Sequence, residues 1–186
     1  MNWLGHLIQK EISKNDTVLD LGCGIMQCTT DTIEFYPSRN PFKNTRILNC
    51  KSLLGCDIWI KYLEKVKNIF PVIQISMNEL YRFVDESFDV VICLDVLEHL
   101  SLPDASHAIN EMKRIARKKV IIYTPSAFET NDEHVENVWE IGFNQHQLHK
   151  CFVSPQLLQE AKFKISFPEP DHNTLAIYTK GEKKNG

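Results

Sequence analysis

Short apolar runs rich in β-branched residues alternate with amphipathic stretches along most of this chain. The alternation is typical of βαβ units, in which parallel strands form a sheet and the intervening helices cover its faces. The run from Phe88 to Leu94 is almost entirely apolar, as expected of a central strand covered on both sides. The pattern predicts one doubly wound α/β domain over residues 1–180, followed by a polar tail at residues 181–186.

The apolar runs also predict the individual elements. We expect a mostly parallel, seven-stranded sheet with helices on both faces and an antiparallel last strand. Two stretches, residues 36–45 and 129–150, show neither the alternation of a strand nor the period of a helix. We expect both to overhang the ligand-binding edge of the sheet. The predicted strands are 17–21, 51–56, 71–75, 88–94, 119–123, 163–167 and 174–178, and the predicted helices are 58–68, 104–117 and 155–162.

Composition narrows the class of protein. The chain has 186 residues, of which 43% are hydrophobic and 24% charged, so a packed core is available. With a net charge of −3, the chain lacks the positive charge that typically attracts nucleic acids. We therefore expect a small-molecule acceptor rather than a nucleic acid. We also expect a cytoplasmic protein without membrane association, because neither a signal-peptide pattern nor a run of ~18 apolar residues is visible.

Cysteine spacing argues against a zinc site or a disulfide framework. No two cysteines form a Cys-x-x-Cys pair, and several lie inside apolar runs, so we interpret them as reduced, mostly buried side chains. The six cysteines are Cys23, Cys28, Cys50, Cys56, Cys93 and Cys151.

The first predicted strand runs into the turn Gly22-Cys23-Gly24. Glycines at such a turn allow the backbone to approach a ligand closely at the carboxyl end of the strand. A dinucleotide-binding fingerprint would require another glycine at position 27, which is Gln27. The turn therefore argues against a nicotinamide-dependent dehydrogenase.

Two further groups of polar residues follow predicted strands. Asp57 ends the second strand, where a carboxylate can accept hydrogen bonds from both hydroxyls of a ribose or can cap the helix that follows. Asp95, Glu98 and His99 follow the strand at 88–94. They can orient an acceptor or take up a proton, or they can serve only as caps and packing.

These motifs, together with Ala116–Pro125, resemble the class I S-adenosylmethionine-dependent methyltransferases, which have a Rossmann-like fold, and more narrowly the type 11 methyltransferase domain. The resemblance runs in register from about Asp16 to Tyr178. It implies that Asp20, Gly22, Cys23 and Gly24 hold the methionine end of S-adenosylmethionine, that Asp57 and Ile58 lie at the ribose, and that Cys93 and Leu94 lie beside the sulfonium.

The chain departs from the family pattern at two places. Met26 stands where the family often has a third glycine in the first motif. Ser76 stands where an aspartate commonly binds the adenine amino group. We expect Ser76 to bond adenine and Met77 to pack on its ring.

The resemblance implies methyl transfer from S-adenosylmethionine, and we expect O-methylation of a small polar or sugar-type acceptor. His99 is the candidate general base, because its ordinary pKa of ~6.5 suits proton transfer near neutrality. His146 and His149 are the next candidates.

Two alternatives stay open. The chain could be a non-catalytic scaffold with a methyltransferase-like fold. Alternatively, Asp95, Glu98 and His99, with His146 or His149, resemble the site of metal-dependent RNA 2′-O-methyltransferases. The oligomeric state is not predicted.

Overall fold

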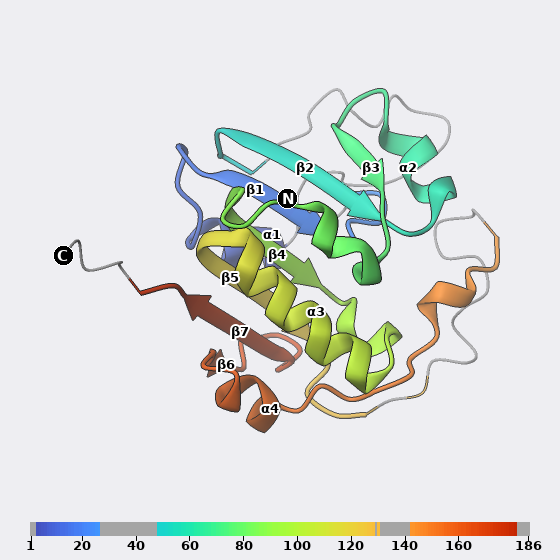
Figure 1. The fold of residues 1–186 in the computed structure, drawn as a ribbon. Helices are drawn as coiled ribbons and strands as arrows, with labels where there is room; N and C mark the ends of the chain where they lie inside the picture. Colours follow the sequence, from blue (N-terminus) through green and yellow to red (C-terminus); the bar gives the residue numbers. More distant parts are fainter. Residues whose placement is uncertain (1–2, 27–47, 129, 131–141, 182–186) are drawn as a thin grey trace.

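A seven-stranded sheet with the strand order β3-β2-β1-β4-β5-β7-β6 forms the centre of the computed structural model, which describes residues 3–26, 48–128, 130 and 142–181 (Figure 1). β7 is antiparallel to both of its neighbours, whereas the other neighbouring strands are parallel. The predicted fold class is therefore confirmed. The strands are β1 Thr17–Leu21, β2 Ser52–Asp57, β3 Val72–Gln74, β4 Phe88–Leu94, β5 Ala116–Thr124, β6 Lys164–Ser166 and β7 Thr174–Thr179.

Helices cover both faces of this sheet. Successive strand residues point to opposite faces, so Leu19 and Val91 pack with α3 and α4, whereas Val18 and Val90 pack with α1 and α2. Figure 1 shows α3 crossing one face of the sheet. The helices are α1 Trp3–Gln9, α2 Ile60–Val66, α3 Leu102–Ile115 and α4 Pro155–Glu160, and the short 3-10 helices are η1 Met77–Arg82, η2 Leu97–His99 and η4 Gln145–Gln147.

Helix boundaries differ from the sequence predictions for local reasons. The helix predicted over 104–117 is α3, and it begins earlier because the Ser101 hydroxyl accepts a hydrogen bond from the Asp104 backbone N–H at 3.3 Å. It ends at Ile115, since Ala116 is extended and already begins β5. The prediction of a helical Arg117 was therefore wrong, and the fifth strand begins earlier than predicted.

Other predictions fall outside the described residues. These are the predictions for residues 36–45, 131–141 and 182–186. Within the described ranges, the helices are too short or too polar to cross a lipid bilayer.

A cluster of charges joins the amino ends of three neighbouring strands. The Asp89 carboxylate in β4 accepts hydrogen bonds from the Thr17 backbone N–H in β1 at 2.9 Å and from Arg117 in β5 at 2.8 Å. Burial raises the pKa of Asp89, but hydrogen bonds from Thr17, Arg117 and Lys118 outweigh burial and lower it to about 2. Asp89 thus ties β1, β4 and β5 together at the edge opposite the Gly22-Cys23-Gly24 turn.

We expect Asp89→Asn to destabilise the protein by about 1–3 kcal/mol at neutral pH, because Thr17, Arg117 and Lys118 lose an ionised acceptor. The folded-state pKa of about 2 lies below the ~3.9 of an unfolded chain, so this stabilisation is present above ~pH 4 and is lost as pH falls through about 2. Urea denaturation should therefore show a difference between wild type and variant that shrinks on acidification.

The matched control is Asp85→Asn, because Asp85 also contacts an arginine but its side chain is 74% exposed. We expect this control to cost less than about 1 kcal/mol. If the cost of Asp89→Asn did not change with pH, the charge of Asp89 would not be its source.

Candidate functional site

The carboxyl ends of β1, β2 and β4 open onto one cavity of about 570 Å³. Ligands bind at this edge of an open α/β sheet, near the point where the strand order reverses, and here the reversal lies between β1 and β4. The cavity is lined by most of the residues predicted from the sequence, namely Asp20, Gly22, Cys23, Gly24, Asp57, Ile58, Ser76, Met77, Leu94 and His99.

The turn after β1 has the left-handed backbone that favours glycine. Gly22 has φ +70° and Gly24 has φ +52°. A Cβ on Gly22 would lie 2.2 Å from Cγ2 of Val96, because the loop after β4 packs directly on the turn. Met26 is left-handed as well, with φ +64°, and is fully buried. The backbone at Met26 therefore adopts the conformation that a third glycine would favour.

Asp57 links the ends of two strands to the approach of α2. One carboxylate oxygen accepts a hydrogen bond from the Gly24 backbone N–H at 2.9 Å, and the other accepts one from the Trp59 backbone N–H at 2.8 Å. Burial raises the pKa of Asp57, and these two N–H groups oppose that rise. Each oxygen retains a lone pair for a ligand. Asp57 thus stabilises the turn and can also accept hydrogen bonds from a ligand.

Cysteines near the turn are not suited to nucleophilic chemistry. Burial, followed by the charges of Asp20 and Asp57, raises the pKa of the thiols of Cys23 and Cys56. Cys93 was expected to line the cavity, but it does not, because its side chain is fully buried in the core beneath α3. Neighbouring strand residues face opposite sides, so Leu94 reaches the cavity whereas Cys93 does not.

The side of the cavity after β3 is built by η1. Ser76 caps this helix: its hydroxyl oxygen accepts a hydrogen bond from the Asn78 backbone N–H at 3.3 Å, and its own N–H donates to Glu79 at 3.0 Å. Arg114 of α3 holds the other end of η1 by donating to the carbonyl of Leu80 at 3.0 Å. η1 was not among the predicted elements, although Ser-x-x-Glu is the signature of a capping box.

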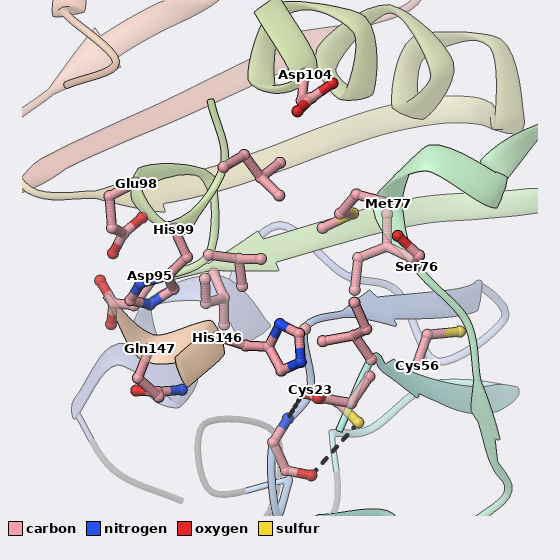
Figure 2. Close-up of a pocket in the computed structure, with 18 of the residues that line it drawn as sticks. Cys23, Cys56, Ser76, Met77, Asp95, Glu98, His99, Asp104, His146 and Gln147 are labelled. Atoms are coloured by element: carbon pink, nitrogen blue, oxygen red, sulfur yellow. Dashed lines mark hydrogen bonds between the residues drawn. The ribbon is translucent and has the colours of Figure 1, made fainter. Parts of the chain in front are cut away.

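The opposite side of the cavity gathers acidic groups and histidines after β4. Figure 2 shows Asp95, Glu98 and His99 on this side, with Ser76 and Met77 across the cavity. Burial and the charge of Asp171 raise the pKa of Asp95 to about 7, and burial and the charge of Asp95 raise the pKa of Glu98 to about 8. Carboxyl groups with such pKa values are partly protonated at neutral pH.

The pKa of His99 differs from the value near neutrality that the sequence suggested. Burial, followed by the charge of nearby His149, lowers the pKa of His99 to about 4 rather than leaving it near neutrality. Its Nδ1 lies 3.4 Å from the carbonyl oxygen of Leu148, and its ring lies 5.1 Å from that of His149. Since a carbonyl only accepts, a hydrogen bond at this contact requires the proton on Nδ1, and in the neutral ring the lone pair is then on Nε2.

Among the described residues, Glu98, His99 and His149 form a group that could hold a metal ion. Each offers one ligand atom, and these atoms lie within 4.8 Å of one another. A carboxylate and two imidazoles suit transition metals such as Zn²⁺ or Mn²⁺. The Leu148 carbonyl would orient the His99 ring, as second-shell acceptors do in metal sites.

Comparisons with known proteins agree with this fold. Residues 40–124 match the family model described as Methyltransferase domain. An uncharacterized protein of Methanocaldococcus jannaschii is 33% identical over 129 residues, which are 64% of this chain and 48% of that protein. The chain thus spans about half the length of the curated relative that it matches.

Solved structures share the fold at low sequence identity. A SAM-dependent methyltransferase from Archaeoglobus fulgidus has a TM-score of 0.62 at 16% identity, over 95% of this chain and 94% of that one. Magnesium protoporphyrin IX methyltransferase from Synechocystis, solved with bound SAH, has a TM-score of 0.58 at 14% identity, over 95% and 80%. This chain therefore has the fold of the class I S-adenosylmethionine-dependent methyltransferases, and its residues 40–124 match the methyltransferase domain family.

Proposed function

We propose that this chain transfers the methyl group of S-adenosylmethionine to a hydroxyl of a small polar or sugar-type acceptor. The observation that carries the proposal is the arrangement of Asp57. Its carboxylate lines the cavity at the end of β2, and the N–H groups of Gly24 and Trp59 hold it in place. The remaining lone pairs can accept hydrogen bonds from two neighbouring hydroxyls, such as those of a ribose.

The rest of the cavity fits the same cofactor. At the turn after β1, Gly22 and Gly24 line the cavity beside Asp20, so their backbone would face the methionine end. Across the cavity, Met77 offers an apolar surface for adenine. The Ser76 hydroxyl accepts from Asn78 and still has its own proton to donate to a ring nitrogen. Leu94 would lie beside the sulfonium.

When bound, S-adenosylmethionine supplies an electrophilic methyl group on a sulfonium that leaves as a neutral thioether. The chain has to align the acceptor oxygen with that methyl group, exclude water and receive the hydroxyl proton. We assign the alignment to His99, whose Nε2 lone pair can accept the hydrogen bond of the hydroxyl. With a pKa of about 4, His99 is neutral at pH 7 and free to accept the proton, which it would release to solvent when the products leave.

The acceptor half of the cavity supports a polar, hydroxyl-bearing substrate. Asp95, Glu98 and His149 line this half together with His99. Such groups make hydrogen bonds with hydroxyls, and an apolar acceptor would displace water from them without offering a hydrogen bond in return, which is costly.

The proposal predicts that the wild-type protein binds S-adenosylhomocysteine in isothermal titration calorimetry. Asp57→Asn should weaken this binding by about 10- to 100-fold, because hydrogen bonds to a charged acceptor are worth about 1.5–3 kcal/mol. Asp85→Asn, which lies outside the cavity lining, is the control and should bind as the wild type does. Absence of binding at high micromolar ligand would instead favour a non-catalytic scaffold.

A second candidate is metal-assisted O-methylation, and the group formed by Glu98, His99 and His149 favours it. A bound cation would lower the pKa of the acceptor hydroxyl and would hold the acceptor next to the donor. A pair of vicinal hydroxyls, as at the 3′ end of an RNA, could bind such a cation through both oxygens. The acceptor is then the 2′-hydroxyl of a nucleotide rather than a free sugar.

The two candidates differ in their response to metal. If the second is right, Co²⁺ added to EDTA-treated protein should give visible d–d absorption bands, and His149→Ala should remove them, because one of three protein ligands is lost. His107→Ala is the matched control, since His107 lies on the exposed side of α3. A protein that gives no such bands and keeps its activity in EDTA would exclude the metal-assisted candidate.

A further inference from the structure

The segment Asn144–Lys150, here called the strap, supplies part of the cavity lining. At one end Asn144 is only 3% exposed and lies near the buried Tyr62 of α2. At the other end the Lys150 backbone N–H donates to the Glu98 carbonyl at 2.7 Å. The strap therefore lies near α2 at one end and is held by the loop after β4 at the other.

His146 occupies the middle of the strap and lines the cavity. Its backbone N–H donates to Oδ1 of Asn144 at 3.0 Å, so the buried end of the strap fixes its position. Figure 2 shows its ring inside the cavity, between Cys23 on one side and Asp95 and His99 on the other. The ring is also close enough to Asp57 to interact electrostatically with that carboxylate. His146 thus faces the same space as the predicted ribose acceptor.

We propose that His146 is a cofactor-contacting residue that binds the ribose of the nucleoside together with Asp57. This inference rests on the proposed function, since it assigns one more side chain to the same cofactor. It concerns the nucleoside part of the cofactor and is independent of the acceptor.

Hydrogen-bond chemistry explains why a second residue is needed. A carboxylate only accepts hydrogen bonds, so each ribose hydroxyl would donate its single proton to Asp57. The oxygen of that hydroxyl then retains lone pairs that need a donor. An imidazole N–H can supply this donor from the strap side, whereas the backbone N–H groups of Gly24 and Trp59 are already directed at Asp57.

Calorimetric titration with S-adenosylhomocysteine and with adenosine tests the inference without a known acceptor. His146→Ala should weaken the binding of both ligands by about tenfold, as expected for the loss of one buried hydrogen bond. The substitution keeps the backbone contact to Asn144, and unchanged thermal unfolding would confirm that the strap stays in place. His146→Gln, which retains a side-chain donor, should recover part of the affinity, and His107→Ala is the matched control.

A double-mutant cycle with Asp57→Asn separates a shared role from an indirect one. If both residues bind the same hydroxyls, His146→Ala should lower the affinity by less than about twofold in the Asp57→Asn background, because the two effects are not additive. Unchanged affinity in His146→Ala would overturn the inference, as would a loss confined to S-adenosylhomocysteine, which would place His146 at the amino-acid end. If the wild type bound neither ligand, the proposed function would fall and this inference with it.

Discussion

The donor half of the site depends on the buried carboxylate of Asp57. Its two hydrogen bonds, to Gly24 and Trp59, fasten the turn after β1 to the end of β2 and to the approach of α2. A buried carboxylate without such partners would be costly to maintain, so the same bonds that position Asp57 also make its burial tolerable. The carboxylate proposed to receive the ribose is therefore also the group that shapes the Gly22-Cys23-Gly24 turn.

Much of the fold could be predicted from periodicity because the strands lie in a sheet covered on both faces. β1 and β4 match their predicted bounds, since their apolar runs end where the chain leaves the core. Helix ends were less predictable because they depend on single contacts. Ser101 sets the start of α3, and the extended backbone at Ala116 sets its end. The 3-10 helix η1 has no apolar period from which it could be predicted, because it forms through the capping-box hydrogen bonds of Ser76 and Glu79.

Within the site, the sequence motifs identified residues that meet at one edge, but not their environments. Asp20, Gly22, Gly24 and Asp57 lie together because the carboxyl ends of neighbouring parallel strands share that edge. The side-chain direction of Cys93 and the low pKa of His99 could not be inferred, since both depend on the packing of distant segments. The closeness of His149 to Glu98 and His99 likewise depends on the return path of the chain, which no local motif encodes.

The direct passage from α3 into β5 has a mechanical consequence. Ile115 ends the helix and Ala116 already pairs with β4, so no loop residue between them can absorb a rotation. Arg114, in the last turn of α3, donates to the carbonyls of Leu80 and Phe83 and couples η1 to the same helix. A hinge needs residues whose φ and ψ can change, and this junction provides none. The wall of the cavity that η1 forms is therefore tied to the sheet through α3, and a hinge that adjusts the cavity to acceptors of different shape would have to lie outside this junction.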